Sequence, residues 1–124
     1  MYEILITKEM VEAYGKITND YNPIHFDEEY AKRTKFGGTI VHGMLIGGLI
    51  SSSLVDHYGW GIIYISQTLD FRVPVRIGDK VKIVFKGEVY LPKNRLQLFV
   101  DVSVMDQTVV EGQALIIIPF KKEF

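Results

Sequence analysis

The chain has 124 residues, of which 48% are hydrophobic and 23% are charged. This length and composition indicate one globular domain over residues 1–124 and argue against intrinsic disorder. Because 14 Lys and Arg residues face 15 Asp and Glu residues, the net charge is −1, which excludes the broad basic surface of a nucleic-acid-binding protein.

The chain has no Cys and only three His. Disulfides, thiolate nucleophiles and Cys-based metal sites are therefore excluded, and any metal would depend on carboxylates. The N-terminal segment lacks the basic start and apolar run of a secretory signal. The most apolar stretch, residues 40–55, contains His42 and falls short of the ~20 apolar residues that span a bilayer. We therefore expect a cytoplasmic protein with no membrane partner.

The first 40 residues predict short elements. Residues 2–6 predict a strand, and Thr7 can cap a helix that runs to about residue 18. The segment DYNPIHF is expected to be irregular, because Pro23 disfavours the helical backbone in Asn22. Asp27 can cap a further short helix, which Gly37-Gly38 ends.

Residues 43–57, GMLIGGLISSSLVDH, predict a helix that is apolar or small on almost every side. Such a helix is expected to be buried on most sides. Its Gly residues, at positions 43, 47 and 48, each cost about 1 kcal/mol of helix propensity relative to Ala. We expect strand side chains to pack closely against the helix at these glycines.

From residue 62 onward, alternating apolar residues predict four strands, at 62–71, 80–91, 95–106 and 108–118. On the second strand we expect one face to hold Val81, Ile83, Phe85, Val89 and Leu91. The short, turn-like breaks favour antiparallel neighbours. One buried helix and at least four antiparallel strands predict an α+β domain whose sheet wraps around the long central helix, a hot dog arrangement.

The first candidate for chemistry is the pair Asp20 and His25, five residues apart across a segment that Asn22 and Pro23 stiffen. On a bent loop the two side chains can converge on one water and exchange protons with a substrate. The structural alternative is that Asp20 makes a local turn bond and His25 is a satisfied, half-buried histidine. Spacing alone favours the structural alternative.

The second candidate is the start of the apolar helix. The Gly43 N–H has no partner within the helix, and a residue without a side chain lets a ligand oxygen approach, as in an oxyanion hole. The alternative is that strands crowd Gly43, and this is favoured without further context. His42 is expected to bond nearby backbone. Ser51 can bond a substrate or a carbonyl of its own helix.

The D-x-N-P-x-H pattern at 20–25, followed by I-V-H-G-M at 40–44, resembles the signature of the MaoC-like, (R)-specific enoyl-CoA hydratases. The resemblance extends through residues 65–71 and 74–81. It implies a hot dog fold and a lyase that reversibly hydrates trans-2-enoyl-CoA to (R)-3-hydroxyacyl-CoA in fatty acid metabolism. The sequence departs from the family at Asn19, where many members have Gly, and at Thr39, where Pro is frequent.

By this resemblance Asp20 and His25 match the catalytic pair, Gly43 matches the donor to the thioester oxygen, and Ser51 matches a serine near the active site. Asn22, Pro23 and His42 would then shape the site. The reaction needs no metal and no cofactor, because the acyl-CoA or acyl-carrier thioester is the substrate. The family's dimers, and the exposed sheet edge expected here, imply a homodimer or a higher homo-oligomer.

Two other functions remain open. A hot dog thioesterase would direct water at the thioester carbon, and a non-catalytic acyl-CoA-binding module would bind without turnover. Contacts to CoA are not defined by the pattern. Charge alone offers Arg33, Lys35, Arg72, Arg76 and Lys93, and for each of these a solvated surface position is the simpler interpretation.

Overall fold

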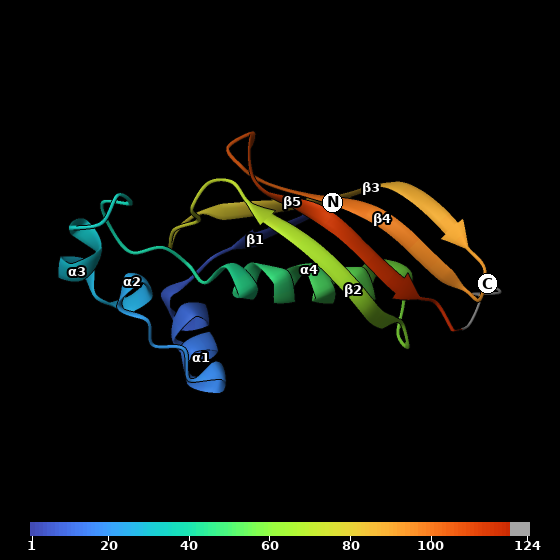
Figure 1. The fold of residues 1–124 in the computed structure, drawn as a ribbon, viewed down its shortest axis with the longest axis horizontal. Coiled ribbons are helices and arrows are strands. Elements are labelled where there is room, and N and C mark those ends of the chain that lie inside the picture. The colour runs from blue at the N-terminus through green and yellow to red at the C-terminus, as the bar shows by residue number, and fades with distance from the viewer. Residues whose placement is uncertain (120–124) are drawn as a thin grey trace.

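A computed structural model describes residues 1–119, and residues 120–124 of the predicted domain lie outside the described residues. Within the described part the elements are β1 (Tyr2–Leu5), α1 (Lys8–Thr18), α2 (Pro23–Phe26), α3 (Glu28–Lys32), α4 (Gly43–Tyr58), β2 (Ile63–Phe71), β3 (Lys80–Leu91), β4 (Arg95–Val104) and β5 (Gln107–Ile117). The strands form one antiparallel sheet in the order β1-β3-β4-β5-β2. The curved sheet passes over α4 (Figure 1), which confirms the predicted α+β hot dog arrangement.

The core lies between α4 and the sheet. Ile46, Ile50 and Leu54 recur every four residues on α4 and are at most 1% exposed, because this spacing places them on one side of the helix. Facing apolar residues of β4 alternate inward as predicted, and the buried ones are Leu96, Leu98, Val100 and Val102. The packing of these two elements fixes where α4 begins relative to the sheet.

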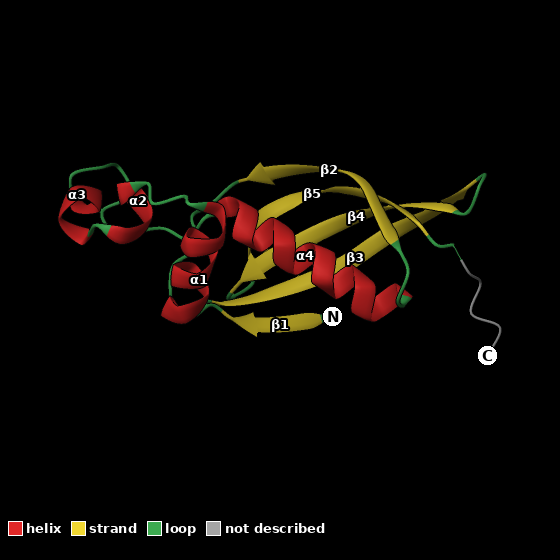
Figure 2. Cartoon of the chain, turned by 90° about the horizontal axis from the view of Figure 1, so that it is seen from below, coloured by secondary structure: helices red, strands yellow, loops and turns green. Residues whose placement is uncertain are grey.

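The other side of α4 is uncovered, so the expectation of burial on most sides is wrong for the single chain. Met44 is 53% exposed and Gly48 is exposed, because the sheet covers only one side of the helix (Figure 2). Strand side chains do pack at Gly43 and Gly47, but a Cβ at Gly48 would meet open space. None of the helices within residues 1–119 is long and apolar enough to cross a membrane.

Two predictions about the strands were wrong. On β3, Val89 is 52% exposed and does not continue the buried face, because the register shifts between Lys86 and Val89, around Gly87 with its φ of +66°. The break between β2 and β3 is not a turn between neighbours. Residues 72–79 carry the chain across the sheet, so β2 pairs with β5 and β3 pairs with β1 and β4.

The segment after Asn22 was predicted to be irregular, and this was also wrong. Pro23 begins the helical turn α2, where its missing N–H costs nothing, and the side chain of Asn22 caps the turn. The predicted caps at Thr7 and Asp27 are confirmed. Helices α2 and α3 project beyond the end of the sheet, on the side where α4 begins, and α3 lies farthest out (Figure 1).

Candidate active site

Asp20 sits in a tight connection between α1 and α2. Asn19 adopts the left-handed backbone conformation, with φ of 60°. Gly reaches this conformation easily and Asn tolerates it. Asn at position 19, where many family members have Gly, is therefore compatible with this turn. The Asp20 N–H donates to Thr18 Oγ1 at 3.3 Å, and the Asn22 N–H donates to Asp20 Oδ1 at 3.3 Å. The local turn bond of the structural alternative is therefore present, and it helps to fix the carboxylate.

His25 lies on α2 and is half-buried. Its Nδ1 lies 2.8 Å from the carbonyl oxygen of Ile40, while the Ile40 N–H donates to the carbonyl of Ile24 at 3.1 Å. Because a carbonyl oxygen only accepts, Nδ1 carries the hydrogen, and in the neutral ring Nε2 keeps a free lone pair. The ring is therefore oriented with a basic nitrogen available.

The structure brings Asp20, His25 and His42 together. One carboxylate oxygen and one nitrogen of each imidazole all lie within 4.8 Å of one another. A water can bond to several atoms at such separations, and so can a cation. A ring held by a backbone carbonyl, as His25 is, suits either a general base or a metal ligand. At His42, Nε2 already faces the carbonyl oxygen of Asp20 at 3.1 Å.

Partial burial lowers the pKa of His25 below its ordinary value, and the neighbouring His42 adds to the lowering. The bond to the Ile40 carbonyl and the charge of Asp20 act in the opposite direction without reversing it. His25 is therefore neutral at pH 7, the form in which Nε2 accepts a proton.

A cavity of about 450 Å³ opens beside His25, within the size range of small-molecule sites. It reaches His25 and Gly43, and its other lining residues are Lys35, Phe36, Ile40, Val41, Met44, Ile46, Phe71, Arg72, Val73, Pro74, Val75 and Val110. Asp20 is exposed and does not line it. The lining is mostly apolar, and its polar side chains are those of His25, Lys35 and Arg72.

Gly43 is the first residue of α4, so its N–H has no acceptor within the helix. A Cβ at this position would lie 2.6 Å from the ring of Phe71, so close packing does explain the glycine. Gly43 nevertheless lines the cavity, which leaves its N–H beside the space where a ligand would sit.

Ser51 is not brought to this site. It is half-buried, does not line the cavity, and follows Gly43 by eight residues, about 12 Å along the helix. Asn22 and Pro23 shape the turn that carries His25, through the Asn22 cap and the Pro23 start of α2.

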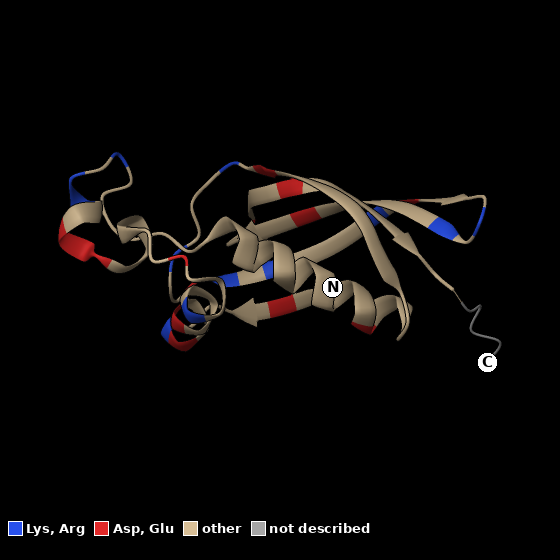
Figure 3. Cartoon of the chain, turned by 60° about the horizontal axis from the view of Figure 1, so that its bottom comes forward, with Lys and Arg blue, Asp and Glu red and all other residues tan. Residues whose placement is uncertain are grey.

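The five candidate cations have different surroundings. Arg76 donates to the carbonyls of Phe36 and Thr39 and so anchors the segment after α3. Arg72 and Lys35 line the cavity, whereas Arg33 and Lys93 do not. Figure 3 shows basic positions interspersed with acidic ones along the part of the chain that the structure describes.

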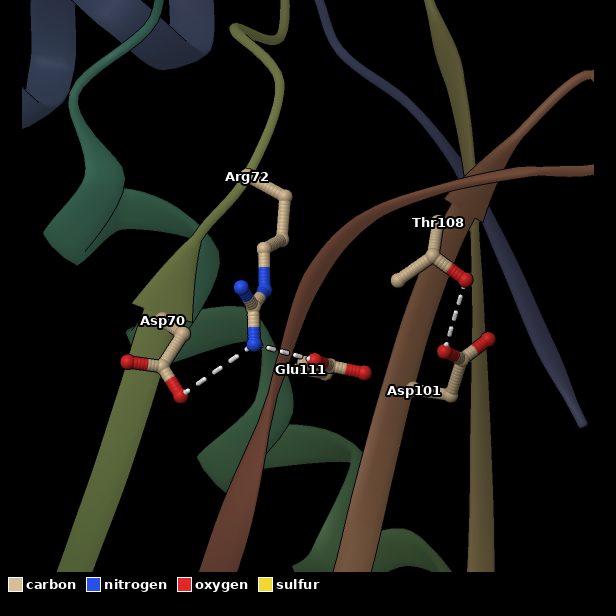
Figure 4. Close-up of polar contacts among 5 residues, drawn as sticks. All are labelled: Asp70, Arg72, Asp101, Thr108 and Glu111. Atoms are coloured by element: carbon tan, nitrogen blue, oxygen red, sulfur yellow. Dashed lines mark hydrogen bonds and ion pairs between the residues drawn. The ribbon is translucent and has the colours of Figure 1, made fainter.

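The charge of Arg72 is balanced at the cavity edge. Its Nη2 lies 2.6 Å from Glu111 and 3.9 Å from Asp70 (Figure 4). Asp101 lies further along the sheet, where it accepts a hydrogen bond from Thr108 at 3.0 Å. Because two carboxylates flank its guanidinium, Arg72 is a weaker candidate for an anionic ligand than Lys35.

The apolar wall of the cavity was not predicted. Phe71, Phe36 and Val75 come from a strand end and two loops that meet only in the folded chain. The glycine at position 43 was the one available signal, because it predicted close packing without saying that the contact would be the ring of Phe71.

Known proteins share this architecture. A model of the MaoC like domain matches residues 1–105. This chain belongs to the MaoC-like family. The MaoC-like chain is 44% identical over 120 residues to "3-hydroxybutyryl-CoA dehydratase" of Methylorubrum extorquens, an alignment that covers 95% of this chain and 76% of the relative. It is 35% identical over 116 residues to "(R)-specific enoyl-CoA hydratase" of Rhodospirillum rubrum, covering 92% and 81% respectively.

Solved structures of R-hydratases have the same fold as this chain. The unliganded R-hydratase PhaJ1 from Pseudomonas aeruginosa superposes with a TM-score of 0.88 at 37% identity, over 97% of this chain and 79% of that one. The (R)-hydratase from A. caviae involved in PHA biosynthesis superposes with a TM-score of 0.87 at 31% identity, over 95% and 92%. The predicted resemblance and the hot dog fold are therefore confirmed.

Proposed function

We propose that this MaoC-like protein is a hydro-lyase that adds water to trans-2-enoyl thioesters to give (R)-3-hydroxyacyl thioesters, and that it catalyses the reverse dehydration. The observation that carries the proposal is the convergence of the Asp20 carboxylate and the His25 imidazole, beside a mostly apolar cavity that His25 and Gly43 line. The names of the relatives at 44% and 35% identity support the same reaction.

In the proposed reaction, Asp20 and His25 hold one water. Its oxygen bonds to C3 of the substrate, the electrons of the double bond move toward the thioester oxygen, and a proton is delivered to C2 as the carbonyl re-forms. The water loses one proton and C2 gains one, so the pair ends with the protons it began with. The lowered pKa of His25 supports this role, because it keeps Nε2 free to accept.

The Gly43 N–H is proposed to stabilise the negative charge that develops on the thioester oxygen. Donors of this kind contribute about 10²–10³ in rate, and the positive end of the α4 dipole adds to the effect. The absence of a side chain at Gly43 and its place in the cavity lining support this assignment.

Several features bear on the substrate. The apolar lining suits an acyl chain, and Lys35 offers one positive charge to a phosphate of CoA or of an acyl carrier. Ser51 lies about 12 Å along α4 from Gly43. It does not line the cavity, so a substrate contact at Ser51 is proposed from the family resemblance alone.

The second candidate is a non-catalytic acyl-CoA-binding module, which the position of Asp20 outside the cavity lining favours. Incubation with crotonyl-CoA, following enoyl absorbance and free thiol together, distinguishes the possibilities. A hydratase consumes the enoyl group without releasing thiol, and a thioesterase releases thiol. A binding module shows saturable binding with neither change.

We further propose that the protein is a homodimer. Among residues 1–119, β2 pairs only with β5, which leaves its other edge unpaired there, and it carries exposed Ile63 and Ile65. Met44 on α4 is exposed as well. A second copy would cover both surfaces, since free edges of this kind are normally paired. Sedimentation at the mass of one chain would contradict this assignment.

A further inference from the structure

His42 is buried directly beneath the proposed catalytic pair. It is the residue before α4, it is 2% exposed, and its side chain does not cap the helix. Its Nε2 lies 3.1 Å from the carbonyl oxygen of Asp20, so Nε2 must carry the hydrogen. Its Nδ1 is buried without a hydrogen-bond partner.

The ring of His42 is held from several sides. It stacks on His25 with a centroid separation of 3.8 Å and an interplanar angle of 29°. Tyr14 and Phe26 contact it at centroid separations of 4.8 Å and 5.5 Å. These contacts come from α1 and α2, so the ring is packed between the two helices.

Within the described residues, the bond from His42 is the only hydrogen bond between Asp20 and a residue distant in sequence. The other bonds of Asp20 go to Thr18 and Asn22, two residues away in either direction. Those bonds shape the turn but do not tie it to the domain. The exposed turn is therefore anchored by a residue that also touches the His25 ring and precedes Gly43.

We infer that His42 is a positioning residue that sets the separation of the Asp20 carboxylate and the His25 imidazole: its Nε2–H anchors the Asp20 turn and its ring supports the His25 ring. This inference rests on the proposed function. It assigns no contact between His42 and substrate, because His42 does not line the cavity.

Two substitutions separate the hydrogen bond from the ring. His42→Phe keeps an aromatic ring but has no donor for the Asp20 carbonyl. His42→Gln keeps an N–H at a comparable reach but removes the stacked ring. Val102→Ala, which shortens a fully buried side chain on β4, is the matched control for a loss of stability alone.

Misplacement of a reacting group by about 1 Å costs about 10²-fold in rate. We therefore expect His42→Phe to lower kcat by 10-fold to 100-fold on crotonyl-CoA, with little change in KM. His42→Gln should recover part of that loss, because it restores the donor to the Asp20 carbonyl but not the stacked ring. Val102→Ala should lower the thermal midpoint and leave kcat per folded protein unchanged.

The second readout is independent of activity. Titration of the His25 ring followed by NMR should move to higher pH in His42→Gln, because the stacked ring that shields His25 from water is gone. The charged and titratable groups that face His25 are Asp20, His42 and, across the cavity, Lys35 and Arg72. All but His42 are unchanged in this variant. His42→Phe loses the same charge interaction with His25 but keeps a ring, so a larger shift in His42→Gln than in His42→Phe reports on the stack.

Retention of kcat within twofold in His42→Phe, or an unmoved His25 titration in His42→Gln, overturns the inference. Failure of the unaltered protein to hydrate any enoyl-CoA overturns the proposed function instead. In that case the NMR titration still decides whether His42 supports the His25 ring.

Discussion

The ring of Phe71 lies against the Cα of Gly43. A Cβ built at position 43 would fall 2.6 Å from one ring carbon, closer than unbonded atoms approach. Phe71 ends the edge strand β2 and Gly43 begins α4, so this contact closes one wall of the cavity where the two elements meet.

This contact allows packing at Gly43 to be tested separately from ligand binding. We expect Gly43→Ala to lose about 1–3 kcal/mol of unfolding free energy to overpacking, offset by about 1 kcal/mol of helix propensity. Its hydratase activity should fall as well. Urea denaturation and crotonyl-CoA kinetics measure the two effects.

Phe71→Ala combined with Gly43→Ala should restore stability, because the clash is removed. If the thioester oxygen must approach position 43 closely, the double variant stays slow although it is folded. Full activity in the double variant would show that Gly43 is needed only to accommodate Phe71.

The activity of the proposed enzyme should persist below the pH at which ordinary histidines become charged. Because partial burial lowers the pKa of His25, its neutral form survives below pH 6.5, the ordinary histidine value. The acid limb of a kcat/KM profile should therefore lie below pH 6.5. An acid limb clearly above pH 6.5 would assign that titration to another group.

The lowered pKa of His25 also predicts how the free energy of unfolding depends on pH. Below about pH 6.5 the unfolded chain protonates His25 while the folded chain does not, so protons favour unfolding. The unfolding free energy should fall as the pH drops from about 6.5 through the folded pKa, and this part of the loss should vanish in His25→Ala. Parallel urea titrations of both proteins between pH 7.5 and pH 5, roughly bracketing that value, measure it.

Because the backbone at position 19 is left-handed, this position is expected to accept Gly but not Ala without a loss of stability. Asn19→Ala should cost about 1 kcal/mol of unfolding free energy, because a Cβ is disfavoured in this conformation, whereas Asn19→Gly should be close to neutral. Chemical denaturation of the pair measures the difference. Equal stability of the two variants would contradict the turn described here.

The predicted reaction needs no metal, although Asp20, His25 and His42 lie close enough to hold one. Hydration of crotonyl-CoA should be unchanged after dialysis against EDTA. Loss of activity on chelation, with recovery on adding one divalent metal, would mean that the three residues hold a metal.

Much of the fold followed from local patterns. Period-two alternation located the strands and the apolar run at 43–57 located α4, because both signals depend on neighbours in sequence. The exposed side of α4 was missed, since that run is apolar or small almost all the way round. The pairing of β2 with β5 could not be predicted, since it depends on how residues 72–79 cross the sheet. The exposure of Val89 was missed because a bulge at Gly87 reverses the alternation.

The site was predictable only in part. The spacing of Asp20 and His25 alone favoured a structural role, and the resemblance to the MaoC-like family was what indicated a catalytic pair. The two side chains do lie close together. The stacked His42 was predicted only as a residue that bonds backbone, because a contact across 17 residues leaves no local pattern. The placement of Ser51 away from the cavity could not be foreseen from the motif, which carries no information on cavity shape.

Hydration of crotonyl-CoA by the unaltered protein, by Asp20→Asn and by His25→Ala tests the central claim most directly. We predict turnover by the unaltered protein without thiol release, and a loss of at least about 10²-fold in kcat in each variant, with thermal midpoints showing that both remain folded. Turnover near that of the unaltered protein in either folded variant would contradict the proposal that these two side chains move the protons.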